Sequence, residues 1–473
     1  MAITLIAEGS YPYIAGGVST WIHHLVKDIS DQDFRLLSIM PDPNPEPKLE
    51  LKYEIPDNIV FMETQYLNTY LELRHSTRRR EPRLSKKEKE VISDFLFFKP
   101  ELDWKLFAET ITNKKKMGTA LQFLRSRFFW EIVRKRYLEE FYQAEFNAFF
   151  WTIRSMLLPV LHILQADFNL ETDAFHCVST GYAGLIGIVL AQKTGLPLIL
   201  TEHGIYARER EEEIIKSKWV QGAYKRLWIE FFYFISIGVY HHAQKVITLF
   251  YHNHEIQVEL GAAREKSVVI PNGVNMSSFP FIEQVATQNV VATVTRVVPI
   301  KDIMTLIRSF KLVVDRRPEA KLLIIGPTDE DPDYYRNCLN LVSLLGLDEQ
   351  IDFTGRVNVR EYLPQIDLML LTSISEGQPL TILESMSSGV PFVASNVGSC
   401  QELLYGAEGD EFGRAGLITP PVSPAKTAEA IMELLENLDL RREMSSNGRA
   451  RIEAYYTNER LVESYRKVYG DVQ

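Results

Sequence analysis

The stretch that decides the fold is Ser375-Glu376-Gly377-Gln378-Pro379-Leu380-Thr381-Ile382-Leu383-Glu384. A buried strand is expected before it, over residues 367–372, and another strand after it, over residues 392–395. Pro379 suits the first helical position, where a missing amide proton costs nothing, and Gly389 suits a left-handed helix stop. The stretch therefore predicts a strand, a loop, a short helix and a second strand.

Two carboxylates, Glu376 and Glu384, lie on either side of this predicted helix start. The unpaired amides and positive dipole end of a helix favour a phosphate, and carboxylates accept hydrogen bonds from hydroxyl groups. A phosphate between two hydroxyl-binding carboxylates describes a nucleotide sugar. We expect Glu384 to bind the ribose and Glu376 to bind the sugar beyond the diphosphate. Spacing alone leaves open the alternative that both are ordinary helix-start and surface acids.

Length and composition favour a soluble globular protein of two domains. The 473 residues exceed one ordinary core, and 46% of them are hydrophobic while 24% are charged. A net charge of -10 argues against nucleic acid as the main partner. Cys177, Cys338 and Cys400 lie far apart and lack metal-ligand spacing, which suits a reducing cytosol. No secretory signal is expected, and the apolar run 227–240 is too short to span a bilayer, which favours a buried helix.

In the first half of the chain, two places at the ends of predicted strands can approach a ligand. Gly16 and Gly17 lie at a strand-to-helix turn, where paired glycines let the backbone come close to a ligand, although a tight turn alone would explain them equally. His203 follows the predicted strand 197–201, and the carboxyl end of a parallel strand faces the ligand crevice. A lone histidine is more often structural. Residues 206–210 are predicted to be a charged loop on the acceptor side.

A long helical, aromatic and basic region over about residues 63–170 interrupts the alternation of strands and helices. Its segment 78–87 is rich in arginine and lysine in an acidic protein. This segment is either a solvated loop or a docking site for an anionic surface or partner. Alternation then resumes and continues to the end of the chain, which predicts two Rossmann-like units.

A pair of cations, Arg296 and Lys301, is predicted on a single loop next to a second helix start. Two fixed cations and helix amides can stabilise a leaving diphosphate without a divalent ion. Taken alone, such residues are usually surface charges. A metal-dependent alternative rests on Asp331 and Asp333, an Asp-x-Asp pattern that also suits the acidic start of a helix.

With these motifs the sequence resembles glycosyltransferase family 4, whose members are retaining enzymes of the GT-B fold. The resemblance extends over nearly the whole chain. The resemblance rests on Glu376-Gly377-Gln378-Pro379 with Glu384 eight positions after the first glutamate, on Thr201-x-His203-Gly204, and on the Gly-Gly loop, Arg296, Lys301 and the linker 271–275. It implies an α/β GT-B fold of two Rossmann-like domains facing a central cleft. The expected domains are an acceptor-side domain over residues 1–275 with a helical insertion at about 63–170, a nucleotide-sugar domain over 276–452, and a C-terminal helix, 453–473, that returns to the first domain.

The same resemblance implies the chemistry and its residues. It implies retaining, metal-independent transfer of a hexose from a UDP-sugar, with no cofactor. UDP-glucose is the expected donor, and a UDP-N-acetylhexosamine is the second choice. The implied catalytic residues are His203, Glu376, Arg296 and Lys301. The implied donor-binding residues are Gly16, Gly17, Arg296, Lys301, Arg356, Val357, Gly377, Gln378, Pro379, Leu380, Thr381 and Glu384.

The N-terminal stretch 5–13, the run Gly16-Gly17-Val18-Ser19-x-Trp21 and the helical insertion resemble more narrowly the cytosolic glycosyltransferases of Pel exopolysaccharide synthesis. This narrower resemblance implies a growing polysaccharide as acceptor and a membrane synthase complex as partner, with recruitment to the inner face of the membrane. The alternative function is a catalytically silent UDP-sugar-binding scaffold of such a complex.

Overall fold

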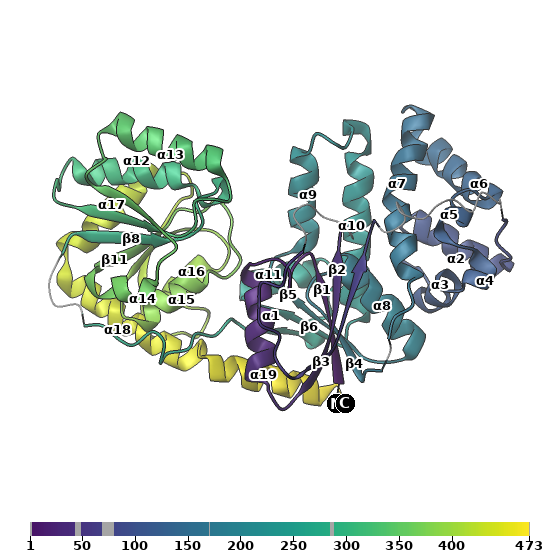
Figure 1. The fold of residues 1–473 in the computed structure, drawn as a ribbon, viewed down its shortest axis with the longest axis horizontal. Helices are drawn as coiled ribbons and strands as arrows, with labels where there is room; N and C mark the ends of the chain where they lie inside the picture. The colour runs from purple at the N-terminus through teal and green to yellow at the C-terminus, as the bar shows by residue number, and fades with distance from the viewer. Residues whose placement is uncertain (1, 43–48, 69–79, 170, 284–287, 473) are drawn as a thin grey trace. The chain divides into compact units, whose positions relative to one another are not determined.

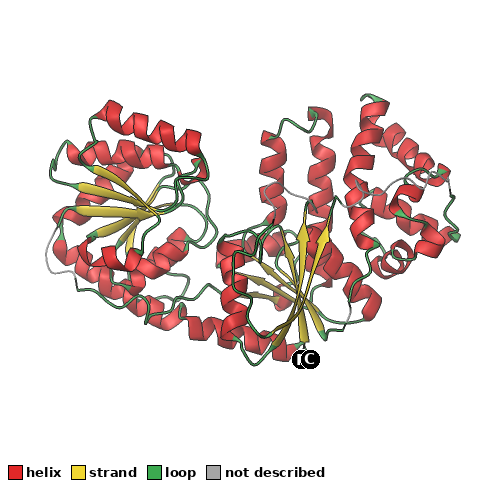
Figure 2. Ribbon diagram, in the orientation of Figure 1, coloured by secondary structure: helices red, strands yellow, loops and turns green. Residues whose placement is uncertain are grey.

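The computed structural model describes the chain apart from residues 1, 43–48, 69–79, 170, 284–287 and 473. The chain divides into two compact units. Unit 1 comprises Met1–Thr248, Asn253–Val269 and Tyr465–Gln473, and unit 2 comprises Leu249–His252 and Ile270–Ser464. Each unit contains one parallel sheet with helices packed around it (Figures 1 and 2). The predicted fold class, an α/β protein of two Rossmann-like units, is confirmed.

Unit 1 is built on a sheet of seven strands in the order β3-β2-β1-β4-β5-β6-β7. The strands are β1 (Ala2–Glu8), β2 (Asp33–Met40), β3 (Ile59–Tyr66), β4 (Ala174–Cys177), β5 (Leu198–Glu202), β6 (Lys245–Thr248) and β7 (Ser267–Val269). The central strands β1, β4 and β5 are apolar and almost wholly buried, as expected for a parallel sheet covered on both faces. The carboxyl ends of β1 and β5 place Glu8 and His203 at the same edge of this sheet.

Helices account for the rest of unit 1, including a group inserted between β3 and β4 (Figure 1). The helices are α1 (Gly17–Asp28), α2 (Lys86–Leu96), α3 (Trp104–Ile111), α4 (Lys114–Met117), α5 (Ala120–Phe123), α6 (Arg127–Arg136), η2 (Tyr137–Phe141), α7 (Phe146–Leu164), α8 (Tyr182–Thr194), α9 (Tyr206–Lys216), α10 (Gly222–His242), α11 (Tyr251–Glu259) and η3 (Arg264–Lys266). The inserted helices α2 to α7 share one continuous hydrophobic core with the sheet and with α8 and α10. The insertion is therefore an integral part of unit 1.

Unit 2 is built on a six-stranded sheet in the order β10-β9-β8-β11-β12-β13. The strands are β8 (Val290–Val294), β9 (Lys321–Ile325), β10 (Ile351–Gly355), β11 (Leu368–Leu371), β12 (Phe392–Ser395) and β13 (Gly416–Thr419). The helices are η4 (Pro299–Lys301), α12 (Ile303–Val314), α13 (Pro332–Leu345), α14 (Val359–Tyr362), η5 (Leu363–Gln365), α15 (Leu380–Ser387), α16 (Cys400–Tyr405), α17 (Pro424–Glu436), α18 (Leu438–Tyr455) and the first half of α19 (Asn458–Asp471), whose residues from Tyr465 on belong to unit 1. The stretch quoted first forms the predicted unit β11, loop, α15 and β12, with Gly389 in the left-handed region at φ 73°.

Three sequence expectations need correction. First, β3 continues to Tyr66 as the edge strand of the unit 1 sheet, so the insertion begins after Tyr66, slightly later than the expected start at about residue 63. Second, residues 206–210 are not a loop, because they form the first turns of α9, whose charged side chains pair along the helix, as in Arg210–Glu213 and Lys216–Glu212. Third, Pro379 is the N-cap of α15 and the helix begins at Leu380.

The last helix, α19, completes unit 1 with residues from the end of the chain. The hydroxyl of Tyr469 lies 3.0 Å from Nδ1 of the buried His176, and the hydroxyl of Tyr465 lies 3.0 Å from Oγ1 of Thr201. Arg466 forms an ion pair with Asp31. The sheet of unit 1 therefore holds the C-terminal residues through buried aromatic side chains.

Helix α7 is the one helix, within the described parts of the chain, that has the length and apolar character needed to cross a bilayer. The run 227–240, expected as a buried helix, lies in α10, and most of its apolar residues are buried. Cys177, Cys338 and Cys400 are buried free thiols.

Candidate active site

The centre of the candidate site in unit 2 is an ion pair between Lys301 and Glu376. Nζ of Lys301 lies 2.6 Å from Oε1 of Glu376, and their side chains are only 17% and 10% exposed. Oε1 of Glu376 also accepts a hydrogen bond from the hydroxyl of Ser373. The structure therefore brings together two of the predicted catalytic residues, which are separated in the chain by the segment from α12 to β11.

Hydrogen bonds between neighbouring loops hold this pair in place. Oγ1 of Thr372 donates to the backbone carbonyls of Lys301 and Asp302 at 3.2 and 3.1 Å, and the amide of Ile374 donates to the carbonyl of Ile300 at 2.9 Å. These bonds join the loop after β11 to the turn η4 that carries Lys301. The geometry of the pair is therefore fixed by the backbone and does not depend on the two side chains alone.

A second support, which the sequence reasoning missed, comes from the turn after β12. The amide and hydroxyl of Ser399 both donate to the carbonyl of Gly377, at 3.0 and 3.1 Å. Gly398 has φ 52°, and a Cβ atom there would lie 2.2 Å from the carbonyl oxygen of Glu376. Glycine is therefore required at this position for the two loops to approach each other. The pair Gly398-Ser399, shortly after the predicted strand 392–395, was the available signal.

The start of α15 offers free backbone amides beside Glu376. Among the described residues, the amides of Gly377, Gln378, Leu380 and Thr381 have no hydrogen-bond acceptor. Such amides at the positive end of a helix favour an anionic group.

The side chain of Gln378 has a structural task at this helix start. Its Oε1 accepts from the amide of Asn272 at 2.6 Å, and its Nε2 donates to the carbonyl of Leu249 at 3.2 Å. Because both ends of the side chain are engaged within unit 2, only its backbone amide remains available to a ligand.

Glu384 lies one turn further along α15 and is mostly buried. Burial raises the pKa of this carboxyl to about 7, and the positive charge of Arg360 opposes the shift. A carboxyl group kept in a poorly solvated position at neutral pH is typical of functional sites.

The remaining predicted cations of unit 2 have partners of their own. Arg296, in the loop after β8, forms an ion pair with Glu330, and Arg356, after β10, lies 3.7 Å from Asp329. Arg296 and Lys301, expected to act together from one loop, therefore contact different carboxylates. Val357, next to Arg356, is exposed.

The acidic segment that suggested a metal site is occupied by helix capping and ion pairs. Oδ1 of Asp331 accepts from the amide of Tyr334 at the start of α13, and Asp333 lies 3.3 Å from Arg336. Within the described ranges, no three of the His, Cys, Asp and Glu side chains gather as metal ligands would. The local role of Asp331 and Asp333 is to start α13.

In unit 1, His203 lies directly after β5 with one ring nitrogen unused. Its Nε2 is buried and has no hydrogen-bond partner among the described residues. The ring packs edge-on against Trp21, with 4.8 Å between centroids, and burial lowers the pKa of the imidazole to about 4. His203 is therefore neutral at physiological pH and retains a nitrogen that can hydrogen-bond to a ligand.

A network that the sequence reasoning missed fixes the backbone on both sides of His203. The preceding residue, Glu202, is buried and accepts hydrogen bonds from the hydroxyl of Tyr240 at 2.7 Å, from Gln257 at 2.8 Å and from the amide of Tyr206 at 3.0 Å. Burial raises the pKa of Glu202. This carboxyl joins β5 to α9 and α10, and it holds His203 at the edge of the sheet.

Gly16 and Gly17 begin α1 at the same edge of the unit 1 sheet and are exposed. A Cβ atom at either position would have no heavy atom within 4 Å, and neither residue lies in the left-handed region of φ that favours glycine. By contrast, a Cβ atom at Gly181 would collide with Tyr206. The fold therefore requires glycine at 181 but does not require it at 16 or 17, where the open space leaves room for a ligand.

Family models match both halves of the chain. Residues 1–265 match a domain of unknown function, DUF3492, and residues 277–451 match the model of glycosyl transferases group 1.

Characterised relatives resemble parts of the chain at low identity. The chain is 29% identical over 174 residues to N-acetyl-alpha-D-glucosaminyl L-malate synthase of Bacillus anthracis, covering 37% of this chain and 43% of that protein. It is 26% identical over 296 residues to the MMP alpha-(1->4)-mannosyltransferase of Mycolicibacterium hassiacum, covering 61% of this chain and 66% of that protein. The chain therefore spans less than two thirds of the length of both relatives.

Solved structures with the same fold cover the whole chain. Sucrose-phosphate synthase from Thermosynechococcus elongatus has a TM-score of 0.62 at 17% identity and covers 100% of this chain and 98% of its own. HepE from Anabaena, solved in complex with UDP, has a TM-score of 0.61 at 15% identity and covers 100% of both chains. These likenesses identify the two Rossmann-like units as a GT-B fold. Because the DUF3492 model matches more than half of the chain, the chain belongs to the DUF3492 family, and it joins that domain to a group 1 glycosyltransferase domain.

Proposed function

We propose that this protein is a retaining glycosyltransferase that transfers a hexose from a UDP-sugar, with UDP-glucose the first choice, to a growing exopolysaccharide. The observation that carries the proposal is the buried Lys301–Glu376 pair beside the free amides of α15. Lys301 and the helix amides can bind the negatively charged diphosphate of a nucleotide sugar, and Glu376 can accept hydrogen bonds from the hydroxyls of its sugar.

Each part of the donor has a candidate partner in unit 2. The free amides at Leu380 and Thr381, together with Lys301, are assigned to the diphosphate. Glu384 is assigned to the ribose hydroxyls and Glu376 to the hydroxyls of the transferred sugar. Arg296 is assigned to the diphosphate as well, which requires it to exchange the carboxylate of Glu330 for a phosphate oxygen.

The proposed reaction breaks the bond between C1 of the sugar and the diphosphate oxygen, and it forms a bond from C1 to the acceptor hydroxyl oxygen. Negative charge develops on the departing diphosphate, where Lys301, Arg296 and the helix amides stabilise it without a divalent ion. The acceptor proton passes to the departing diphosphate oxygen on the same face of the sugar. Retention follows, so an α-linked UDP-sugar gives an α-linked product.

His203 and the Gly16-Gly17 loop are assigned to the sugar and acceptor side. A neutral imidazole can exchange a hydrogen bond with a sugar hydroxyl, and no buried proton transfer is required of it. The open space at Gly16 and Gly17 suits close approach of a ligand to the backbone. Glu376 is held by Lys301 and Ser373, which suits it to bind sugar hydroxyls and does not suit it to act as a base.

The narrower proposal places the protein in Pel exopolysaccharide synthesis, with a membrane synthase complex as partner and the cytoplasmic face of the membrane as its location. Its support is the sequence resemblance to PelF in the N-terminal stretch and the helical insertion. The HepE structures hold UDP or UDP-glucose, which favours the same donor class here.

The test measures UDP release while the purified protein is offered a series of nucleotide sugars. We expect release of UDP that saturates with one UDP-sugar and disappears in the Lys301→Ala variant. UDP-sugar binding by calorimetry with no turnover for any donor, even with oligosaccharide acceptors present, would instead support a silent donor-binding scaffold. Proton NMR of the first product should show an α anomeric coupling, and a β coupling would overturn the retaining mechanism.

A further inference from the structure

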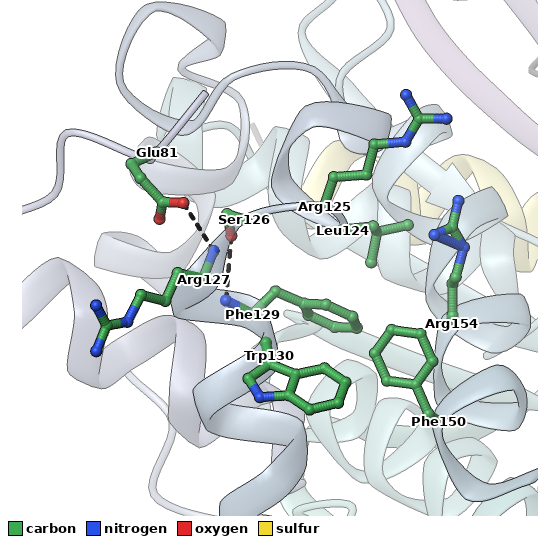
Figure 3. Close-up of a pocket in the computed structure, with 9 residues that line it drawn as sticks. All are labelled: Glu81, Leu124, Arg125, Ser126, Arg127, Phe129, Trp130, Phe150 and Arg154. Carbon is green, nitrogen blue, oxygen red and sulfur yellow. Dashed lines mark hydrogen bonds between the residues drawn. The ribbon is translucent and has the colours of Figure 1, made fainter. Parts of the chain in front are cut away.

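A cavity of about 720 Å³ lies within the helical insertion of unit 1, and none of the residues assigned above to the donor lines it (Figure 3). It is lined by Glu81, Leu124, Arg125, Ser126, Arg127, Phe129, Trp130, Phe150 and Arg154. The lining residues come from α6, from α7 and from the segments that precede α6. Cations and aromatic rings dominate the lining, although the protein as a whole is acidic.

Within the described ranges, two of the three arginines in the cavity have no counter-ion. Among the described residues, the guanidinium groups of Arg125 and Arg154 have neither a hydrogen-bond acceptor nor an ion-pair partner, and Arg154 instead lies over the ring of Trp151 at 5.3 Å. The pKa of Arg154 is lowered, mainly by burial and to a lesser extent by the positive charge of Arg125. Two like charges held near each other without an anion are costly, and a bound anion would relieve that cost.

Arg127 shows the opposite arrangement and serves as an internal comparison. Its Nε donates to Glu131 at 2.8 Å, and its side chain points away from Arg125 and Arg154 (Figure 3). Its side chain is 83% exposed at the start of α6. Arg127 is therefore already neutralised, and the unsatisfied positive charge in the cavity belongs to Arg125 and Arg154.

The helix end in this cavity is already capped by the protein. The carboxylate of Glu81 accepts from the amide of Arg127 at 2.7 Å, and the hydroxyl of Ser126 accepts from the amide of Phe129 at 3.1 Å. These groups fill the anion-binding end of α6. An incoming anion would therefore bind the two arginine side chains and not the helix end.

Aromatic rings form the wall of the cavity next to the arginines (Figure 3). Trp130 is 45% exposed, and its ring lies 5.5 Å from that of Phe150 between centroids. Large exposed aromatic rings are the surfaces on which sugar and base rings stack. The cavity volume also falls within the range of small-molecule sites and far exceeds the space that a lone phosphate needs.

We propose that this cavity binds a phosphate ester that carries a ring, with the phosphate on Arg125 and Arg154 and the ring on Trp130 and Phe150. Two sources supply this chemistry: a soluble sugar phosphate and the headgroup of a ring-bearing phospholipid. The site is separate from the donor site in unit 2, and it does not depend on the proposed transfer reaction.

The experiment measures binding to the whole protein with the donor site saturated by UDP. Glucose 1-phosphate, followed by calorimetry, represents the soluble source, and sedimentation with phosphatidylinositol vesicles represents the lipid source. We expect one of the two probes to bind, and Arg125→Ala/Arg154→Ala to weaken that binding at least tenfold. Trp130→Ala should weaken it severalfold, whereas Arg127→Ala should change it by less than twofold.

The outcomes separate the possibilities. Binding of glucose 1-phosphate identifies a soluble ligand, and binding of the vesicles alone identifies a lipid headgroup. Arg125→Lys/Arg154→Lys keeps the charge and serves as a folding control, with thermal unfolding measured for every variant. The proposal is overturned if neither probe binds, if inorganic phosphate binds as tightly as the ester, or if Arg127→Ala weakens binding as much as the double variant does.

Discussion

The ion pairs of unit 2 fall into two kinds that differ in burial. Lys301 and Glu376 are 17% and 10% exposed, whereas Arg296 and Glu330 are 51% and 47% exposed, and Arg356 and Asp329 are each 75% exposed. Pairs at an exposed surface contribute little and exchange partners easily, whereas a buried pair is strongly coupled to the structure around it. The comparison indicates that Lys301 and Glu376 form the fixed part of the site. Arg296 and Arg356 are instead paired at the surface with Glu330 and Asp329 of the acidic segment, and these pairs can exchange for a ligand.

The largest effect is expected from breaking the buried pair. Lys301→Ala should lower turnover on the order of 100-fold, because a fixed cation at the departing diphosphate is lost. It should also lower the melting temperature, since Glu376 is left partly buried without its counter-charge. Arg356→Ala, which breaks an exposed pair in the same unit, is the matched control for stability. Turnover within threefold of the original protein, in a folded Lys301→Ala variant, would remove Lys301 from the mechanism.

A smaller effect is expected at Glu384. Glu384→Ala should weaken UDP binding about tenfold, the cost of losing hydrogen bonds to a charged group. The same residue predicts a pH dependence, because burial raises its pKa to about 7 and the ionised form accepts more hydrogen bonds from ribose. UDP affinity should therefore fall as the pH drops below about 7.

The stability of the unliganded protein should depend on pH in the opposite sense. The folded state holds the Glu384 proton more tightly than the unfolded state, whose pKa is close to 4.5, so stability should decline as the pH rises from about 4.5 to about 7. Glu384→Gln should flatten both profiles, which calorimetry and thermal unfolding can measure. A UDP affinity that is unchanged in Glu384→Ala would show that the carboxylate does not bind ribose.

Releasing the exposed cation should have a still smaller effect, in the opposite direction. Glu330→Gln frees Arg296 from a competing carboxylate, and UDP-sugar binding should tighten about two- to threefold, the scale of a surface pair. Asp333→Asn, which removes a carboxylate that pairs with Arg336 on the same segment, is the control and should leave affinity unchanged. Weaker binding in Glu330→Gln would mean that the acidic loop itself contributes to the donor site.

The smallest effect is expected from chelation. Turnover in EDTA should stay within experimental error of the untreated rate, because the proposed neutralising charge comes from Lys301, Arg296 and helix amides. If EDTA abolishes activity and magnesium or manganese restores it, a metal ion neutralises the diphosphate. Asp331 and Asp333 would then be the candidate ligands of that ion.

The local parts of the site could be read from the sequence, whereas the pairings between distant segments could not. Apolar runs, Pro379 and Gly389 predicted β11, α15 and β12 because these signals act within a few residues. The sequence suggested that Arg296 acts together with Lys301, but in the structure Arg296 pairs with Glu330. That pairing depends on the adjacency of β8 and β9 in the sheet, which no local pattern reveals. Helix α9 was missed because a charged, solvent-facing helix has only a weak apolar stripe.

The aromatic cavity of the insertion was also outside the reach of the sequence. Its rings come from α6 and α7, which the sequence marked only as parts of a long helical, aromatic and basic region. Part of the basic segment 78–87, Arg78 and Arg79, lies outside the described residues, and Arg80 donates to the backbone carbonyl of Lys115. The two cavity arginines that lack a counter-ion in the described parts of the chain are in a different place, at residues 125 and 154, and only tertiary packing brings them together.

The attachment of α19 has a consequence for how the chain is made. A ribosome that has completed residues 2–269 has made every strand of the unit 1 sheet but not Tyr465 or Tyr469. At that stage the buried ring of His176 lacks the hydroxyl partner that Tyr469 later provides 3.0 Å from its Nδ1. Unit 1 is therefore synthesised first but receives its last residues at the end of translation. Loss of the final nine residues should impair the folding of unit 1 more than that of unit 2.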